Sequence, residues 1–164
     1  MKHPHPSSKI HTRPSLAGIL KKWRAENKKI VFTNGCFDIV HRGHVEYLAE
    51  AAALGDVLVI GVNSDASVRR LGKGPERPIQ DEATRATILA ALGFVDAVTI
   101  FDEDTPHELI THIVPHILVK GSDWSNKAVV GREIVEKNGG RVVLIDIVEG
   151  FSTTGIVQKI KRKK

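Results

Sequence analysis

The chain has 164 residues, 41% of them apolar and 26% charged, which is enough for one globular domain with an ordinary core. Its single cysteine excludes an internal disulfide, and no apolar run approaches the ~18 residues of a membrane-spanning helix. The net charge of +5 comes from the two ends, because residues 30–158 carry 11 basic against 18 acidic side chains. An acidic body argues against a nucleic-acid-binding face across the fold. Without a signal-peptide core, the cytoplasm is the expected compartment.

The composition divides the chain into three parts. Residues 1–14 are rich in Pro, His and Ser, and we expect a flexible N-terminal arm there. Residues 15–160 are expected to form a single domain, because no repeat and no long linker interrupts them. Residues 161–164 form a basic tail, which we expect to be a solvated terminus.

The domain begins with an expected helix that Ser15 caps and that ends near Asn27. The apolar, β-rich run 30–32 then predicts a buried strand, and Asn34 with Gly35 is expected to end it. Apolar residues return at helical spacing from Gly43 to about residue 54, which predicts a second helix.

The same alternation of strand and helix continues to the end of the chain, and it predicts a parallel sheet with right-handed crossovers. In such sheets, ligands bind at the carboxyl ends of the strands. The further strands are expected at 56–63, 95–101, 117–119 and 141–147, and the further helices at 65–70, 81–92, 105–114, 128–138 and from Ser152 onward.

Two histidines stand where the first strand gives way to the second helix, in the sequence His41-Arg42-Gly43-His44. A strand, a glycine turn and a helix start form an anion cradle, because backbone N–H groups and the positive helix end converge there. Two imidazoles three residues apart lie on one face of the first turn. Gly43 has no side chain, so a nucleotide can lie against its backbone. The stretch predicts a phosphate-handling site.

The sequence excludes two glycine-rich nucleotide motifs and leaves two other interpretations of this stretch. No G-x-G-x-x-G follows the first strand and no G-x-x-x-x-G-K-[ST] occurs, so neither a standard NAD fingerprint nor a P-loop is present. The histidine pair could instead begin a zinc site, which would need further ligands. His107, His112 and His116 are not obviously convergent with it. Two ordinary polar residues at a helix start are the remaining alternative.

The chain resembles the HxGH nucleotidyltransferase superfamily across roughly residues 28–160. The resemblance rests on Thr33-Asn34-Gly35-Cys36-Phe37-Asp38 followed by the two histidines. Further matches are Arg85, the segment Lys120-Gly121-Ser122-Asp123-Trp124, and Ser152-Thr153-Thr154. Together they resemble the cytidylyltransferase-like branch, and within it the D-glycero-β-D-manno-heptose 1-phosphate adenylyltransferases. These occur as the second domain of bifunctional heptose kinase/adenylyltransferases and as stand-alone enzymes.

The resemblance implies a Rossmann-like three-layer sandwich with a five-stranded parallel sheet. It implies a reaction of ATP with a heptose 1-phosphate that gives ADP-heptose and pyrophosphate, for bacterial surface glycans such as the lipopolysaccharide core. It also implies Mg²⁺ held mainly by the ATP phosphates rather than by a protein metal site, and a homodimer. No nucleic-acid or membrane partner is expected. Because no kinase sequence precedes residue 1, the sugar phosphate is expected from a separate protein.

The roles that the resemblance implies fall into three groups. A sugar 1-phosphate is already an anionic nucleophile, so the protein has to align it and neutralise developing charge. The expected catalytic residues are His41, His44, Lys120 and Arg85. The expected nucleotide-binding residues are Thr33, Asn34, Gly35, Cys36, Phe37, Gly43, Arg77, Ser152, Thr153 and Thr154. The expected substrate-binding residues are Asp38, Asp123, Trp124 and Lys73.

Three functional alternatives stay open. Glycerol-phosphate cytidylyltransferases are similar to this chain, but they carry an Arg-Thr pair shortly before the Ser-Thr-Thr, where this chain has Glu149-Gly150-Phe151. They also tend to have Thr at the position of Cys36. Both differences favour the heptose-type enzymes, and a cytidylyltransferase for glycerol 3-phosphate or another polyol phosphate is kept as the first alternative. A non-catalytic nucleotide-binding subunit is the second, and a nucleic-acid binder that uses the basic tail is the third.

Overall fold

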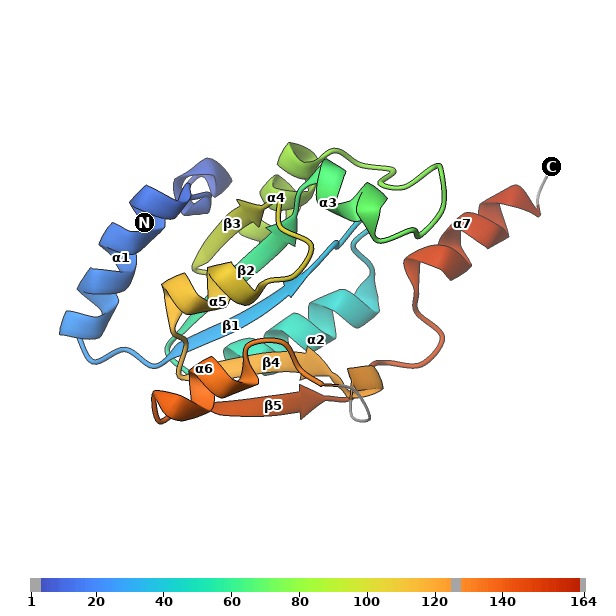
Figure 1. Ribbon diagram of the computed structural model, residues 1–164. Coiled ribbons are helices and arrows are strands. Elements are labelled where there is room, and N and C mark those ends of the chain that lie inside the picture. The colour runs from blue at the N-terminus through green and yellow to red at the C-terminus, as the bar shows by residue number, and fades with distance from the viewer. Residues whose placement is uncertain (1–3, 125–127, 163–164) are drawn as a thin grey trace.

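A computed structural model describes residues 4–124 and 128–162 of the chain. Its centre is a five-stranded sheet in the order β3-β2-β1-β4-β5, with every neighbouring pair parallel (Figure 1). The expected parallel α/β fold is confirmed. The strands are β1 Ile30–Gly35, β2 Val57–Asn63, β3 Ala97–Phe101, β4 Ile117–Gly121 and β5 Arg141–Ile145.

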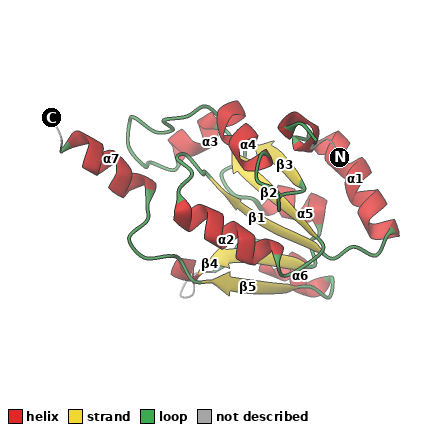
Figure 2. Ribbon diagram, turned by 180° about the vertical axis from the view of Figure 1, so that it is seen from behind, coloured by secondary structure: helices red, strands yellow, loops and turns green. Residues whose placement is uncertain are grey.

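Helices cover both faces of this sheet (Figure 2). Helices α1, α5 and α6 pack on one face, and α2 and α4 pack on the other. No helix among the described residues combines the length and the apolar character that crossing a bilayer requires. The helices are α1 Arg13–Ala25, α2 Arg42–Ala52, α3 Asp65–Arg70, α4 Glu82–Ala90, α5 His107–Ile113, α6 Arg132–Lys137 and α7 Thr153–Lys161; two 3-10 turns are η1 Pro6–Lys9 and η2 Ser122–Trp124.

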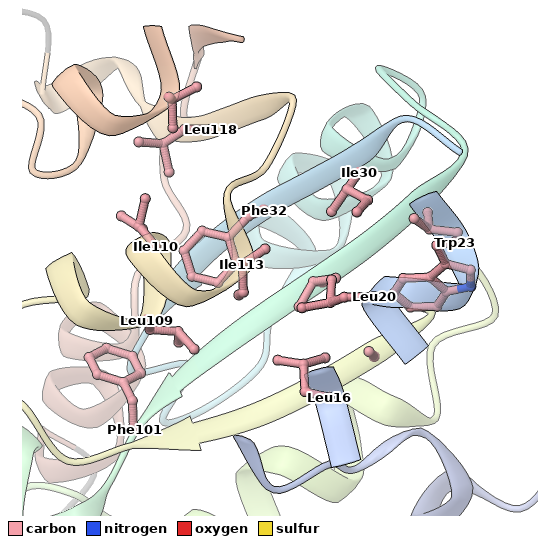
Figure 3. Close-up of a cluster of buried hydrophobic side chains, with 14 of the residues drawn as sticks. Leu16, Leu20, Trp23, Ile30, Phe32, Phe101, Leu109, Ile110, Ile113 and Leu118 are labelled. Carbon is pink, nitrogen blue, oxygen red and sulfur yellow. The ribbon is translucent and has the colours of Figure 1, made fainter. Parts of the chain in front are cut away.

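Strand alternation sorts the apolar side chains into two cores. Along β1, Phe32 points to the α1 and α5 side (Figure 3), while its neighbour Val31 points to the α2 and α4 side. Every residue of β2 is buried, as expected for a central parallel strand covered on both faces. The two cores hold the sheet rigid, so its carboxyl edge is a fixed platform for a site.

The N-terminal segment differs from the expected flexible arm. Residues 6–9 form η1, and Ile10 makes a parallel bridge with Val98 on the edge strand β3. The first helix is capped by Thr12, whose hydroxyl accepts the Ser15 backbone N–H at 3.4 Å, so the expected cap at Ser15 is wrong. This segment therefore covers the open edge of the sheet. Residues 1–3 of the expected arm lie outside the described part of the chain.

The strands β1 and β4 run further than expected. Asn34 and Gly35 continue β1 and pair with Gly61 and Val62 of β2 instead of ending the strand. Strand β4 likewise extends to Gly121. Conversely, α6 begins only at Arg132, after Gly131 in a left-handed conformation (φ +85°), so the expected helix start at residue 128 is wrong. The longer strands carry polar residues to the carboxyl edge of the sheet.

Candidate functional site

A cavity of about 750 Å³ opens at the carboxyl ends of β1, β2 and β4. The sheet order reverses between β1 and β4, which is the position where open α/β sheets bind ligands. Most residues expected at the site line this cavity: Asn34, Gly35, Cys36, Phe37, Asp38, His41, Gly43, His44, Lys73, Arg77, Lys120, Asp123, Ser152, Thr153 and Thr154.

The two histidines lie side by side at the start of α2. His41 is the N-cap of this helix, and its Nδ1 accepts the backbone N–H of His44 at 3.4 Å. The two imidazoles stack with ring centroids 3.8 Å apart and an interplanar angle of 17°. Phe37, in a left-handed conformation (φ +48°), holds its ring edge-on to His44 at 5.3 Å. Local sequence thus fixes both rings at the positive end of a helix.

Burial keeps these imidazoles in the neutral form. It lowers the pKa of His41. It also lowers the pKa of His44 to about 4; the charges of His41 and Lys73 act in the same direction, and the Ile39 backbone acts in the opposite one. Neutral imidazoles still donate a hydrogen bond through one ring nitrogen. The Nδ1 of His44 is buried and has no hydrogen-bond partner among the described residues.

A second helix start meets the first at this point. Ser152 caps α7, and its hydroxyl accepts the Gly155 backbone N–H at 3.0 Å. The Thr153 hydroxyl donates to the Ile39 carbonyl at 3.4 Å, which ties α7 to the loop before α2. We call the residues His41, His44, Ser152, Thr153 and Thr154 the phosphate corner. Two converging helix N-termini give it a positive potential without a charged side chain.

Gly43 makes the close approach of these two helix starts possible. A Cβ atom at this position would lie 3.1 Å from the Cβ of Phe151 and 3.2 Å from the His41 ring. Such contacts are tighter than ordinary van der Waals packing, so a larger residue would displace one of the neighbours. The absence of a side chain at Gly43 thus serves the packing of Phe151 and His41 as well as access to the backbone.

Three cationic side chains line the rest of the cavity. Lys120 is buried, and its ammonium donates to the Asn34 amide oxygen. Burial lowers the pKa of Lys120 to about 8, against the opposing charge of Asp123. The Lys73 ammonium lies 3.6 Å from the Cys36 sulfur. The third cation, Arg77, is buried in an ion pair.

That ion pair joins Arg77 to Asp38. Its carboxylate accepts the backbone N–H groups of Ile79 and Gln80, each at 2.9 Å, and the guanidinium of Arg77. Burial alone would raise the pKa of Asp38, but these two backbone hydrogen bonds and Arg77 together lower it. In this arrangement its oxygens fasten the loop 71–81 to the loop after β1, so the expected contact of Asp38 with acceptor hydroxyls stays a prediction.

Arg85 is also a supporting residue rather than a ligand-facing one. Its side chain has no exposed surface and does not line the cavity. The guanidinium donates to the Cys36 carbonyl at 2.7 Å and the Gln80 carbonyl at 3.0 Å, and it pairs with Asp65 at 2.7 Å. In this structure Arg85 therefore holds the loop after β1 to α3 and α4 instead of facing the cavity.

Two other expected residues are placed differently. Thr33 is fully buried, and its hydroxyl hydrogen-bonds the Tyr47 hydroxyl at 2.8 Å, so it supports the cavity without lining it. The backbone of Trp124 ends η2, but its side chain lies outside the described part of the chain. Its expected contact with the substrate stays a prediction.

The cavity has further lining residues to which the sequence analysis gave no role. Asn63 and Gly121 could have been found, because both end a predicted strand at the carboxyl edge. No local signal marks the others, which reach the cavity through tertiary packing. These residues are Tyr47, Asn63, Leu71, Asp104, Thr105, Pro106, Gly121, Val130, Ile147 and Phe151.

Comparison with known proteins agrees with this geometry. A family model described as cytidylyltransferase-like matches residues 32–159. The chain belongs to the cytidylyltransferase-like family. The Bifunctional protein HldE of Geobacter metallireducens is 57% identical over 98% of this chain, and that of Campylobacter jejuni serotype O:2 is 59% identical over 95%. The chain spans about a third of the length of these relatives, 32% in both cases.

Solved structures of this family and fold are also similar. The lipopolysaccharide core biosynthesis protein from Thermoplasma volcanium is 32% identical, with a TM-score of 0.61 over 74% of this chain and 97% of that one. The pantoate-beta-alanine ligase of Francisella tularensis has a TM-score of 0.58 over 93% of this chain and 76% of that one. At 12% identity, the ligase shares the fold alone. The resemblance inferred from the motifs is confirmed at the level of the family.

Proposed function

We propose that this cytidylyltransferase-like chain is an adenylyltransferase that joins ATP and D-glycero-β-D-manno-heptose 1-phosphate to give ADP-heptose and pyrophosphate. The observation that carries the proposal is the phosphate corner, where two stacked imidazoles meet two helix N-termini inside one cavity. The choice of sugar is supported by the identity of more than half of all residues with the HldE proteins. The product serves bacterial surface glycans such as the lipopolysaccharide core.

The reaction needs alignment and charge neutralisation rather than a protein base. A phosphate oxygen of the sugar phosphate attacks the α-phosphorus of ATP, and the bond from this phosphorus to the pyrophosphate oxygen breaks. Negative charge builds on the leaving pyrophosphate. His41 and His44 donate hydrogen bonds to the phosphate chain, and the backbone N–H groups at the start of α7 hold its far end. Lys73, Arg77 and Lys120 supply the positive charge around it.

The chemistry of the cavity walls orients the nucleotide. Val130, Ile147 and Phe151 are apolar residues that line the cavity, and we call them the apolar wall. Ile147 and Phe151 keep 46% and 37% of their surface exposed, so they offer apolar surface that a bound ligand can cover. An adenine ring offers a flat, largely apolar face to such a wall. Asp123 also lines the cavity and borders the nucleoside.

Mg²⁺ enters the proposal with the triphosphate. Among residues 4–124 and 128–162, no group of three or more His, Cys, Asp or Glu is placed to hold a metal ion. Mg²⁺ keeps several waters and is commonly bound through substrate phosphates, so a phosphate-borne ion fits the residues present. When bound, it neutralises phosphate charge; the imidazoles and helix starts then align the chain of phosphates.

The chain's setting is part of the proposal too. Helix α7 has no buried residue, and Ile160 on it keeps 63% of its surface exposed. A homodimer, which the family resemblance implies, would cover Ile160 if the two copies associated through this helix. A cytoplasmic location would place the enzyme where ATP is made, and the single cysteine is consistent with a reducing compartment.

A screen of nucleotides against acceptors tests the proposal. Pyrophosphate release is measured with ATP and with CTP, each against heptose 1-phosphate and glycerol 3-phosphate. We expect the largest kcat/KM for ATP with the heptose phosphate. A preference for CTP with glycerol 3-phosphate would instead support the polyol-phosphate cytidylyltransferase, which the name of the family favours. Tight ATP binding without turnover of any acceptor would indicate a non-catalytic nucleotide-binding subunit.

A further inference from the structure

The loop after β3 is fastened to α3 by three side chains. The Ser64 hydroxyl donates to the Asp102 carboxylate, and the Ser67 hydroxyl donates to the Glu103 carbonyl at 3.0 Å. Arg70 pairs with Asp104 through its Nε at 2.5 Å. Ser64, Ser67 and Arg70 are three residues apart and so lie on one face of the helix. Three consecutive loop residues are thus held from a single helix face, which is more fixation than a surface loop needs.

The fixed loop presents polar groups to the cavity. Asp104 and Thr105 line it, together with Asn63 at the end of β2. The Asn63 side-chain amide donates to the Ser67 hydroxyl at 3.0 Å, so the residue that holds the loop also orients Asn63. We call Asn63, Asp104 and Thr105 the polar wall. A carboxylate, a hydroxyl and an amide together can both donate and accept hydrogen bonds.

The polar wall suits the sugar hydroxyls of the acceptor better than the triphosphate or the adenine ring of the nucleotide. A triphosphate avoids a carboxylate because like charges repel, and an adenine ring gains more from the apolar wall. Sugar hydroxyls, in contrast, are neutral and each both donates and accepts, so a carboxylate and an amide suit them. Lys73 and Arg77 also line this cavity and can take the phosphate to which such a sugar is attached.

We infer that Asp104, Thr105 and Asn63 bind the hydroxyls of a polyhydroxylated acceptor phosphate, and that Arg70, whose guanidinium pairs with Asp104, is the positioning residue for this loop. The inference rests on the proposed nucleotidyl transfer. Specificity follows from hydrogen bonding: an acceptor that lacks the matching hydroxyl loses the bonds that Asp104, Thr105 and Asn63 would add to those they already make within the protein.

The test compares Asp104→Asn with the wild-type chain. We expect the KM for heptose 1-phosphate to rise about tenfold, in line with the loss of one charge-assisted hydrogen bond. The KM for ATP and the melting temperature should stay unchanged, because Asp104 contacts neither the nucleotide nor the core. Glu50→Gln is the matched control, since it makes the same kind of change on an exposed part of α2 outside the cavity.

Variants of Arg70 distinguish a positioning role from a purely structural role. Arg70→Gln should raise the acceptor KM by a smaller factor than Asp104→Asn and leave the ATP KM unchanged, and Arg70→Lys should restore part of the loss. An acceptor analogue that lacks hydroxyls, such as ethyl phosphate, should be used equally by wild type and Asp104→Asn. Equal acceptor KM values for wild type and Asp104→Asn, or a loss that affects ATP as much as the acceptor, would overturn the inference.

The proposed function can fail separately from this inference. If wild type prefers a different polyol phosphate, the assigned sugar is wrong, while the polar wall is still supported when Asp104→Asn weakens that acceptor alone. If wild type turns over no acceptor, calorimetry of heptose 1-phosphate binding replaces kinetics. Binding that Asp104→Asn weakens would then support the wall, and no binding or equal binding would overturn it.

Discussion

The phosphate corner and the polar wall face the same cavity but are built in opposite ways. In the corner, His41 caps the helix that also carries His44, so four consecutive residues fix both rings. In the polar wall, Asp104 is held by Arg70, which lies 34 residues earlier in the chain. The corner is therefore specified by local sequence, and the wall by long-range contacts.

This difference in construction matches a proposed difference in role, with the corner acting in the chemical step and the wall in acceptor specificity. Groups that act on phosphates need only a helix start and a few donors, and a short motif can provide both. Groups that recognise an acceptor must match its shape, so they come from whichever loops the fold brings to the cavity. Loss of a residue in the corner should therefore reduce the rate for every substrate, and loss of a residue in the wall should change the acceptor preference alone.

The largest expected effect concerns Arg85, the buried residue behind the corner. Arg85→Ala would leave the Asp65 carboxylate and the Cys36 and Gln80 carbonyls without their donor. Breaking a buried ion pair from one side costs about 3–5 kcal/mol, and Asp65 keeps some exposure, so we expect the low end, about 3 kcal/mol of unfolding free energy. Urea denaturation monitored by circular dichroism measures this loss.

Kinetics of the milder Arg85→Lys then show whether Arg85 supports the loop or contacts phosphate. A supporting role predicts that stability and turnover fall together, because lysine cannot reach all three partners. Lower turnover with an unchanged free energy of unfolding would indicate that Arg85 contacts phosphate, which is the role that the sequence motif implied. Arg24, whose guanidinium donates to the Ile113 carbonyl far from the cavity, offers a control: Arg24→Lys should affect turnover little.

Arg85 also illustrates what the sequence could predict. The apolar run of β2 and the spacing of the two histidines are local patterns, and both gave the correct element and the correct cavity residues. The groups that a charged side chain contacts are not determined by the local sequence. An arginine after a glycine-rich loop looks the same whether it faces phosphate or backbone carbonyls, and only the packed fold decides between them.

Asp38 and Asp104 show the same limit from two directions. Asp38 follows the motif directly and was expected to bind substrate, yet two backbone N–H groups and Arg77 occupy its oxygens. Asp104 stands in a polar loop with no motif, and its place on the cavity depends on the face of α3 that carries Arg70. Residues beside a motif can turn inward, and residues far from it can complete the site.

The second effect in size is on the chemical step. His44→Ala should lower kcat by about 10²–10³-fold, the loss typical of one donor to a developing charge. The loss should be the same with every acceptor, because the proposed role of the corner is to hold the triphosphate of the nucleotide, which does not change with the acceptor. Steady-state pyrophosphate release with two acceptors measures it, with the exposed His107→Ala as the matched control. A loss confined to one acceptor would break the division between corner and wall.

The smallest expected effect is a pH dependence of stability that belongs to the corner alone. His44 has its pKa lowered to about 4 by burial, whereas in the unfolded chain it is about 6.5. As pH falls from 6.5 towards 4, His44 is protonated in the unfolded chain before it is protonated in the folded one, so the free energy of unfolding decreases over this range. Above pH 6.5 the contribution of His44 to stability is fully present. The difference between the two pKa values corresponds to about 3.4 kcal/mol at most, of which about 2 kcal/mol is lost between pH 7.5 and 5.0.

Urea unfolding of wild type and His44→Gln at pH 7.5, 6.0 and 5.0 measures this dependence. Wild type should lose more stability than the variant between the first and last of these values, because glutamine does not titrate. His41, whose pKa burial also lowers, contributes in the same direction and remains in both proteins, so the difference between the two curves isolates His44. Asp104→Asn should follow the wild-type curve, since the polar wall takes no part in burying the imidazole. Parallel curves for wild type and His44→Gln would show that the ring is already solvated, and the corner would then lack the dry surroundings that strengthen its hydrogen bonds to phosphate.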